Sequence, residues 1–534
     1  MSTETTQTHG LLVAYAPWAH CRSMVALAGR LMGFNPNLHI TLLVPSIRAT
    51  ASEVELAQYP YENRERLIMG RYSPKEEPNT LAMTRTPMEF VMEAESALAT
   101  IYPALFKVSL VPFKSYGRAD RSTEQGEEVF DPYTGNNYTT HKIPFNFFIT
   151  DFVLGPSRIS LASSWPKVFP DKPLPKNLTY DPLLPAFIAW CALPEICSFP
   201  GHIANLMAIR DNKEEQAKLF QKLIGSSTEV VKLPGLTPFY MHEAEPCIQY
   251  SWGHQIDLAD NLIQAFNSIE GVIAGWPFLW GKEYQEASLK KFGAFYQIGP
   301  QIPPKVKDEW HVENKHITCK AFLDQCLEEY GALSVLYISF GSSVYSPTAE
   351  QLKILLAVLR EMQIPYITSC GNSQPDIKTI LKENVGIGKE DKGLLLDWTP
   401  QRAILSHPAC GWFMSQLGAS SALEMVYYGV PGVFWPGAYD QPLIANELAG
   451  KGVGKYLVQI RTGPNIGKTT YDGVLVEGTE AAMRKEFRET FEMFSTAEGA
   501  KIRDNMRALS EELHADAEPG GGSYEAMKQL AYLK

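Results

Sequence analysis

The chain has 534 residues, of which 45% are apolar and 20% are charged. These are ordinary values for folded globular proteins, so they exclude a disordered or low-complexity chain. The formal net charge of -11 argues against a nucleic-acid partner, because proteins that bind nucleic acids carry a basic surface.

The eight cysteines include no C-x-x-C pair, so we expect free thiols rather than a metal site or a disulfide framework. The first residues are polar, and the apolar run that follows is broken by Pro17 and His20, so no signal peptide is expected. No stretch approaches the roughly 18 apolar residues that a membrane span needs. The sequence therefore predicts a cytoplasmic protein without a membrane span.

The N-terminal half alternates between strand and helix patterns. An apolar run at 11–16 and a β-rich run at 39–44 flank a helical face formed by Met24, Leu27, Ala28 and Leu31. This strand–helix–strand spacing predicts a βαβ unit and a parallel sheet. Further along we expect a helix at 87–100, a polar surface loop at 117–141 and an apolar strand within 145–153.

Composition also divides the chain into parts. The segment 160–200 is rich in Pro, Trp and Phe, which suits the lining of an apolar cleft. The segment 301–317 contains prolines and many charges, and it is the expected linker between domains at 1–300 and 318–513. The tail at 514–534 is expected to form a helix that packs back on the N-terminal domain.

The same alternation restarts after the linker. Strands are expected at 335–340, 394–397, 411–414 and 433–435, and helices after the start signal Ser346-Pro347, at 423–428, at 443–449 and over 479–513. The fold class is therefore α/β, with two doubly wound parallel-sheet halves. Ligands of such folds bind at the carboxyl ends of the strands, so a cleft between the halves is the expected site.

Two glycine-rich segments resemble phosphate loops without meeting their requirements. The segment 463–469 follows Thr462 where a P-loop needs glycine, and Pro464 lacks the backbone N–H that would bind phosphate. The segment 450–454 follows a helix rather than a strand, as expected of a helix end and turn. Since the sequence also lacks an H-E-x-x-H motif and an Asp-x-Asp pair, no metal site is predicted.

The segment 398–441 carries many distinctive residues at fixed spacing. They are Trp398, Pro400, Gln401, Leu405, His407, Gly411, Phe413, Gly418, Ser421, Glu424, Gly429, Val430, Pro431, Trp435, Pro436, Asp440 and Gln441. This segment resembles the signature box of the UDP-dependent glycosyltransferases of small molecules, the plant secondary-product type. The segments 295–300, 337–342 and 521–523 resemble other parts of that family. The resemblance implies a GT-B fold, in which two Rossmann-like domains face each other across a cleft.

The resemblance also assigns a donor site. It implies that Trp398 stacks on the uracil ring, although a tryptophan after a strand is otherwise expected in the core. Glu424 would accept hydrogen bonds from the two ribose hydroxyls, and Gln401 would face the nucleoside. Asp440 and Gln441 would bind the sugar hydroxyls, with a glutamine at the last position pointing to glucose.

The diphosphate would meet neutral donors. Gly418 allows the backbone to approach closely, and Ser420 and Ser421 open a helix whose N–H groups favour an anion. Ser342 would contact the other phosphate. The chain departs from the family here, because the usual His, Cys, Trp and Asn are replaced by Gln416, Leu417, Ala419 and Ser420. Gln416 donates a hydrogen bond without a charge, so we expect donor binding to persist in weakened form.

Two residues of the first half are the expected catalytic pair. His20 stands between the strand at 11–16 and the first helix, at the carboxyl end of a strand. The family keeps its catalytic histidine at this junction, so the resemblance makes His20 a general base. Asp151 ends the apolar run before it, and it would hold the second imidazole nitrogen and stabilise the imidazolium.

The resemblance therefore implies inverting, metal-independent transfer of a sugar, expected to be glucose, from a UDP-sugar co-substrate to a hydroxyl of an apolar, aromatic small molecule. No cofactor is expected. The candidate acceptor-pocket residues are Trp18, Phe145, Phe147, Trp165 and Trp190. Three alternatives stay open: a transferase acting on a lipid or sterol, a UDP-sugar-binding protein without transfer, and a P-loop kinase, which the missing glycine at position 462 opposes.

Overall fold

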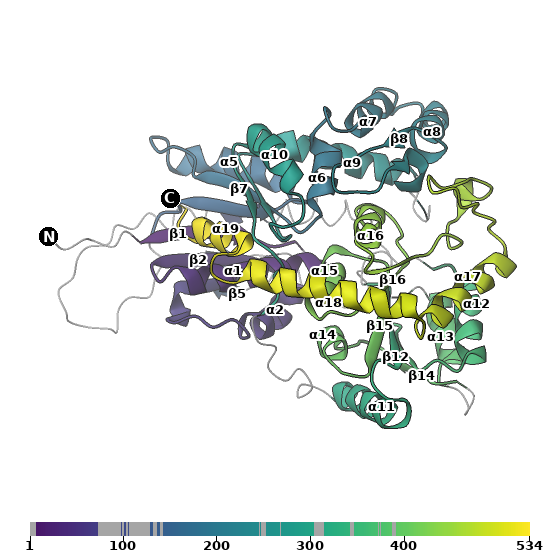
Figure 1. Cartoon of the computed structure of the whole chain (residues 1–534). Helices are drawn as coiled ribbons and strands as arrows, with labels where there is room; N and C mark the ends of the chain where they lie inside the picture. Colours follow the sequence, from purple (N-terminus) through teal and green to yellow (C-terminus); the bar gives the residue numbers. More distant parts are fainter. Residues whose placement is uncertain are drawn as a thin grey trace.

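Two parallel sheets with helices packed around them make up the molecule (Figure 1). The computed structural model describes residues 7–15, 17–72, 98, 101–102, 105, 129–131, 136–138, 143–244, 246, 252–267, 269–303, 314–341, 347–371, 373, 375–386 and 391–533. The helix expected at 87–100 falls outside these residues except for Leu98, and Ser342 also falls outside them.

The first sheet has seven parallel strands in the order β11-β10-β7-β6-β1-β2-β3. Its strands are β1 (Thr8–Val13), β2 (Leu38–Pro45), β3 (Leu67–Tyr72), β6 (Phe147–Asp151), β7 (Lys176–Asp181), β10 (Val272–Ala274) and β11 (Phe295–Gln297). The chain proceeds outward from β1 to β3 and then returns to the other side of β1 as β6. This reversal is a topological switch point, and it brings the carboxyl ends of β1 and β6 side by side.

Helices cover both faces of this sheet because its strands are apolar on both sides. Leu12 belongs to the core beneath α1 (Trp18–Phe34), whereas Leu11 and Val13 belong to the core beneath α5 (Gly155–Val168). The other helices of this half are α2 (Ala49–Leu56), α6 (Pro185–Ala192), α7 (Phe199–Met207), α8 (Lys213–Phe220), α9 (Trp252–Asn267) and α10 (Gln285–Phe292). Two short hairpins, β4 (Val129–Asp131) with β5 (Asn136–Tyr138) and β8 (Val230–Val231) with β9 (Phe239–Tyr240), complete it.

The second sheet has six parallel strands in the order β14-β13-β12-β15-β16-β17. Its strands are β12 (Val335–Ser339), β13 (Tyr366–Ser369), β14 (Gly393–Leu396), β15 (Cys410–Ser415), β16 (Gly432–Phe434) and β17 (Gly454–Tyr456). Its helices are α11 (Asn314–Tyr330), α12 (Ala349–Glu361), α13 (Pro375–Asn384), α14 (Gln401–Leu405), α15 (Ala419–Tyr427), α16 (Gln441–Gly450) and α17 (Glu480–Met493). Here the switch point lies between β12 and β15.

The sequence predicted most of these elements and misjudged several boundaries. The helix expected over 479–513 is two helices, α17 and α18 (Ala497–Ala517), because the Thr496 side chain accepts a hydrogen bond from Gly499 N and starts a new helix. Helix α12 is capped by Thr348 in a capping box rather than by Ser346. Helix α11 begins at Asn314, inside the segment expected to be a linker, and the loop expected at 117–141 contains the β4–β5 hairpin.

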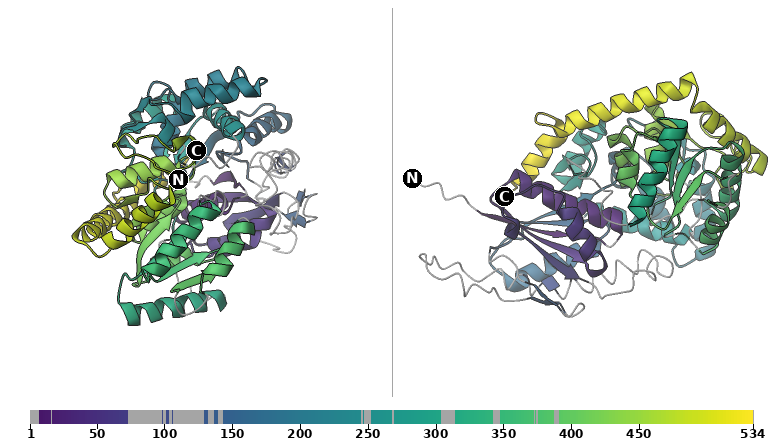
Figure 2. Two further views of the ribbon diagram at one scale, coloured as in Figure 1. Left: turned by 90° about the vertical axis from the view of Figure 1, so that its right-hand side faces the viewer. Right: turned by 90° about the horizontal axis from the view of Figure 1, so that it is seen from below.

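The C-terminal helices connect the two halves. Helix α18, the long yellow helix of Figure 2, packs on α15 and leads to α19 (Gly522–Ala531), which packs on α1 and β11. Met527 and Leu530 are fully buried in the core of the first half, and Asn35 Nδ2 donates to Ala531 O over 2.7 Å. The tail helix therefore lies on the first half.

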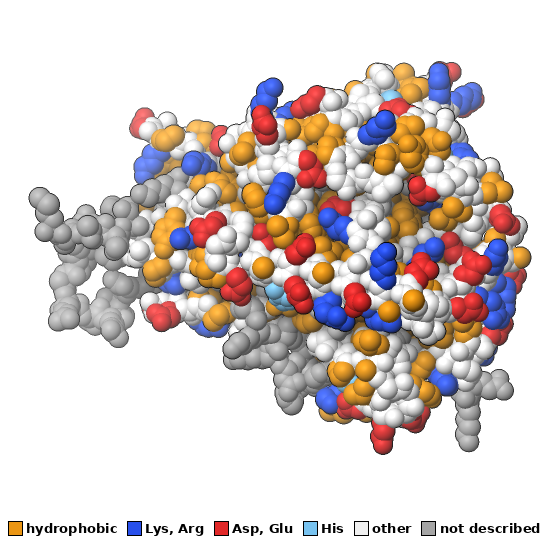
Figure 3. Space-filling view, in the orientation of Figure 1, with side chains coloured by type: hydrophobic (Ala, Val, Ile, Leu, Met, Phe, Trp, Pro, Cys, Tyr) orange, Lys and Arg blue, Asp and Glu red, His pale blue; other side chains and the backbone are white. Residues whose placement is uncertain are grey.

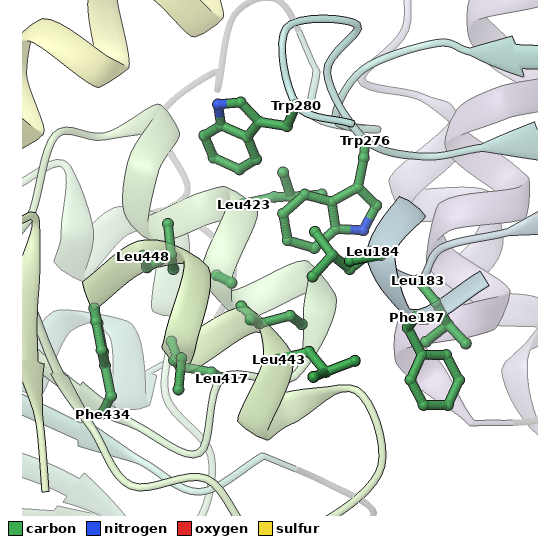
Figure 4. Close-up of a cluster of buried hydrophobic side chains, with 14 of the residues drawn as sticks. Leu183, Leu184, Phe187, Trp276, Trp280, Leu417, Leu423, Phe434, Leu443 and Leu448 are labelled. Atoms are coloured by element: carbon green, nitrogen blue, oxygen red, sulfur yellow. The ribbon is translucent and has the colours of Figure 1, made fainter. Parts of the chain in front are cut away.

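A continuous apolar cluster also joins the two halves (Figure 4). From the first half it includes Leu183, Leu184, Phe187, Trp276 and Trp280, and from the second Leu417, Leu423, Phe434, Leu443 and Leu448. Because these side chains exclude water between the halves, the two sheets are held with their carboxyl ends facing.

The outer surface is polar and mixed in charge. On the face seen in Figure 3, Lys and Arg side chains are interspersed with Asp and Glu, so this face carries no extended basic patch. Along the part of the chain that the structure describes, no helix combines the length and the apolar character needed to cross a membrane. The seven cysteines within the described ranges are buried and free of disulfides, as expected.

Candidate functional site

A histidine–aspartate pair stands at the switch point of the first sheet. His20 lies in the first turn of α1, just after β1, and Asp151 is the last residue of β6. His20 Nδ1 lies 3.0 Å from Asp151 Oδ2, and the side chains are 20% and 0% exposed. The Asp151 carboxylate therefore accepts a hydrogen bond from Nδ1–H and leaves Nε2, the other ring nitrogen, as a base.

The surroundings of His20 favour its protonated form. Burial by itself would lower the pKa of His20, but the charge of Asp151 and the hydrogen bond to it raise that pKa above the ordinary value. The carboxyls of Asp181 and Asp440 act in the same direction. The ring is held between Tyr15, in an edge contact at 5.6 Å between centroids, and Phe152, stacked at 5.5 Å. His20 is thus fixed in orientation and strengthened as a base.

Sequence reasoning missed Asp181, the last residue of β7. Its side chain is fully buried, and burial raises the pKa of the carboxyl to about 8. Asp181 Oδ1 accepts from Leu183 N over 2.8 Å, while Oδ2 has no partner among the described residues. At neutral pH this carboxyl holds a proton. Its place at a strand end beside β6 was the available signal, since the same reasoning had identified Asp151.

Gln401 and Glu424 come together in the second half, and Trp398 lies three residues before Gln401. The Trp398 side chain is 43% exposed, so it is not a core residue and offers a ring face to a ligand. Gln401 Nε2 donates to Glu424 Oε2 over 2.6 Å, and the Tyr337 hydroxyl donates to Gln401 Oε1 over 3.3 Å. These hydrogen bonds fix the amide and the carboxylate against each other.

The segment expected to hold a diphosphate lies where β15 turns into α15. Gly418 is the N-cap of α15, and Leu417 before it adopts a left-handed φ of 63°, which is strained for leucine. Gly341, which follows β12, has a left-handed φ of 72° that favours glycine, and its Cα lies close to the side-chain amide of Gln416. Gln416, Ser420 and Ser421 thus surround the start of a helix, with Ser421 Oγ 3.2 Å from Gln401 Nε2.

The last two box residues begin α16. Burial raises the pKa of Asp440 to about 7, against the influence of His20, which lowers it, and Asp440 Oδ2 has no partner among the described residues. Because Asp440 and His20 influence each other's titration, the two halves meet at this point. Gln441 Oε1 accepts from Gly437 N over 2.8 Å, so its oxygen closes a turn and only its amide nitrogen remains to meet a sugar.

Two pockets lie between the halves. The first, about 510 Å³ of empty space partly open to solvent, has an apolar lining that includes Phe187, Trp190, Leu262, Tyr439 and Leu443. The second, about 310 Å³ and also partly open, is lined from the first half by residues such as Arg22 and Tyr180, and from the second by Ser420, Leu423 and Glu424. Each pocket thus requires both halves.

Of the five aromatic residues expected to line an acceptor pocket, only Trp190 lines one of these two pockets. Phe145 and Trp165 lie in the core beneath α5, where the Trp165 indole donates to Pro173 O over 3.0 Å. Phe147 lies in the opposite core, where its ring fills the space beside Gly10. Trp18 is half-buried and packs on the same core. The rings of Phe145, Phe147 and Trp165 therefore pack in the hydrophobic core, because the faces of β6 and α5 near them are buried.

The glycine-rich segment at 463–469 is not a phosphate loop, as expected. Gly463–Asn465 is a short 3₁₀ turn that no strand enters, and Lys468 Nζ donates to Gly225 O over 2.7 Å. Within the described ranges, no three His, Cys, Asp or Glu side chains gather in a way that could hold a metal ion.

Comparison with known proteins agrees with this arrangement. Residues 266–463 match the family model described as UDP-glucoronosyl and UDP-glucosyl transferase. The UDP-glycosyltransferase eriJ of Hericium erinaceus is 35% identical over 245 residues, which cover 45% of this chain and 47% of that relative. The UDP-glucose flavonoid 3-O-glucosyltransferase 6 of Fragaria ananassa is 26% identical over 342 residues, which cover 61% of this chain and 67% of that relative. The chain thus spans about half of the first relative and about two thirds of the second.

Solved structures match over nearly the whole chain. A UGT transferase from Siraitia grosvenorii in complex with UDP has a TM-score of 0.67 at 16% identity, covering 98% of this chain and 99% of that one. Medicago truncatula UGT71G1, complexed with UDP-glucose, has a TM-score of 0.64 at 16% identity, covering 99% of both chains. These matches confirm the expected GT-B fold, and the family match confirms the resemblance to UDP-glycosyltransferases of small molecules.

The charge of Asp151 is expected to govern the titration of His20. Replacing Asp151 with Asn removes the charge that raises the pKa of His20 and leaves burial, which lowers it. We therefore expect the pKa of His20 in D151N to fall below that of the wild type. NMR titration of the imidazole measures this shift, and an unchanged pKa would contradict the pairing.

The buried Asp181 carboxyl is expected to make stability depend on pH. Its pKa is about 8 in the folded chain against 3.8 as the ordinary value, so the folded state keeps a proton that the unfolded state releases. The contribution of Asp181 to the free energy of unfolding is fully present below pH 3.8 and is lost as the pH rises toward 8. Over this range the free energy of unfolding falls by up to about 1.4 kcal/mol per pH unit.

Urea unfolding between pH 5 and pH 9 tests this dependence. The variant D181N should lose stability less steeply than the wild type, while Asp440 retains its own share in both. The exposed Asp171 provides the control, and D171N should keep the wild-type slope. Equal slopes for D181N and the wild type would show that Asp181 titrates normally.

Proposed function

We propose that this chain, whose residues 266–463 belong to the UDP-glucoronosyl and UDP-glucosyl transferase family, transfers a sugar from a UDP-sugar to a hydroxyl group of an apolar small molecule. The observation that carries the proposal is the position of the His20–Asp151 pair, which faces Asp440 of the donor box across the junction of the two halves. A general base from one half thus meets a nucleotide-sugar box from the other.

The reaction would proceed as a single displacement. His20 Nε2 takes the proton of the acceptor hydroxyl, and the hydroxyl oxygen forms a bond to the anomeric carbon while the bond from that carbon to the UDP oxygen breaks. Asp151 stabilises the imidazolium that forms. Attack opposite to the leaving group inverts the anomeric configuration. UDP leaves with the electron pair toward the N–H groups of α15 and the hydroxyls of Ser420 and Ser421.

The donor would be bound in three parts. Trp398 stacks on the uracil, Glu424 and Gln401 hold the ribose, and the start of α15 holds the diphosphate. Asp440 and the amide nitrogen of Gln441 are left to meet the sugar, for which glucose is the proposed identity. Relatives named as UDP-glucose and glucosyltransferase proteins support this choice. Because the N–H groups at the start of α15 and the hydroxyls of Ser420 and Ser421 would supply hydrogen-bond donors to the diphosphate, we propose that neither a metal ion nor another cofactor is required.

The acceptor would lie in the apolar pocket beside Trp190. The lining of this pocket is aromatic and aliphatic, so it favours a flat apolar acceptor with few polar groups. The printed name of the Fragaria ananassa relative, a flavonoid 3-O-glucosyltransferase, is consistent with an acceptor of this kind.

UDP release tests the proposed reaction. Wild-type protein with a panel of UDP-sugars and phenolic acceptors, in the presence of EDTA, should release UDP only when an acceptor is present. The variant H20A should lose about 10²–10⁴-fold in the rate while binding UDP as tightly as the wild type, because His20 acts on the acceptor.

A second histidine supplies the matched control. His202 Nε2 lies 2.9 Å from Glu229 Oε2, so it forms a similar histidine–carboxylate pair outside both pockets. H202A should retain activity. Wild-type protein that binds UDP but transfers to no phenolic, lipid or sterol acceptor would instead indicate a UDP-sugar-binding protein, and the absence of UDP binding would refute the assignment.

A further inference from the structure

The ribose-binding carboxylate of the second half is already occupied by a cation of the first. Arg22 Nη2 donates to Glu424 Oε1, while Gln401 Nε2 donates a hydrogen bond to the other carboxylate oxygen, Oε2. The Arg22 and Glu424 side chains are 16% and 1% exposed, so this ion pair is largely shielded from water. Ribose hydroxyls that reach Glu424 must therefore compete with the guanidinium of Arg22.

Glu424, the partner of Arg22, stands one helical turn away from the start of α15, where the diphosphate is expected. Ser420 and Glu424 are four residues apart on α15, so their side chains are neighbours on one face of that helix, about 6 Å apart. Both residues and Arg22 line the same pocket. A guanidinium released from Glu424 would therefore remain in the same pocket as Ser420 at the start of α15.

The diphosphate otherwise meets little positive charge. Of the residues that line this pocket, all within the described ranges, Arg22 is the only one with a cationic side chain. The nearby arginines have other partners: Arg402 pairs with Glu55 over 3.0 Å, and Arg30 donates to Ile298 O over 3.2 Å. The box itself carries Gln416, which is neutral. A guanidinium with several donors is well suited to phosphate oxygens.

We propose that Arg22 is a nucleotide-responsive residue: it closes the empty donor site by pairing with Glu424, and on binding of a nucleoside diphosphate it gives Glu424 to the ribose and binds the diphosphate from the opposite half. Resting on the proposed function, this inference adds a charged ligand that the signature box lacks. Because the ligand comes from α1, two residues after His20, diphosphate binding also fixes the helix that carries the base.

Binding of UDP and of uridine distinguishes the two roles of Arg22. In R22Q the affinity for UDP should fall by about 10- to 100-fold, because a charge-assisted contact to the diphosphate is lost. The affinity for uridine, which has no phosphate, should stay the same or rise by up to about tenfold, because the competitor for Glu424 is removed. R22K should retain part of the UDP affinity through its charge.

Calorimetry with R71Q as the control measures these affinities. Arg71 pairs with Glu53 over 3.3 Å on the exposed surface of the same half, so R71Q changes the net charge equally and should bind both ligands like the wild type. Equal UDP affinity in R22Q and the wild type would overturn the inference and leave the proposed function intact. A parallel loss of affinity for UDP and for uridine in both R22Q and R22K would show that Arg22 has only a structural role. Failure of the wild type to bind UDP would overturn both proposals.

Discussion

The candidate site depends on a junction that neither half can form alone. The apolar cluster around Leu184, Trp276 and Leu423 joins the halves, and three largely buried ion pairs cross between them. They are Arg22–Glu424, Arg402–Glu55 and Arg461–Glu243. Removing one partner of a buried pair leaves an unpaired charge at a cost of about 3–5 kcal/mol, so the Arg402–Glu55 and Arg461–Glu243 pairs hold the two sheets facing each other, while Arg22–Glu424 is the pair that the donor would exchange.

This junction explains why the titrations of His20 and Asp440 are linked. Asp151 and Asp181 end two neighbouring parallel strands of the first sheet, and the contact between the two halves brings Asp440, which follows β16 of the second sheet, within electrostatic range of His20. Burial raises the pKa of Asp181 to about 8 and that of Asp440 to about 7, so Asp151 is the principal charge acting on His20.

The sequence predicted the features that depend on residues close together in the chain and missed those that depend on contacts between distant residues. Local patterns located most strands and helices, and fixed spacing located the donor box, because Trp398, Gln401 and Glu424 lie within one continuous segment. His20 and Asp151 were identified from the family resemblance together with their positions at strand ends, and the structure places them 3.0 Å apart. Contacts such as Arg22–Glu424 join residues 402 positions apart, so no local pattern could indicate them. Phe147 and Trp165 were misjudged as pocket residues because composition does not tell which side of an element faces the core.

The anomeric configuration of the product tests the central claim most directly. Attack by an acceptor oxygen that His20 deprotonates passes through one displacement, so UDP-α-glucose must give a β-glucoside. NMR of the product formed by the wild-type protein reads this configuration at the anomeric proton. A β-glucoside would support His20 as a base acting on the acceptor, whereas an α-glucoside would require a different mechanism and contradict the account.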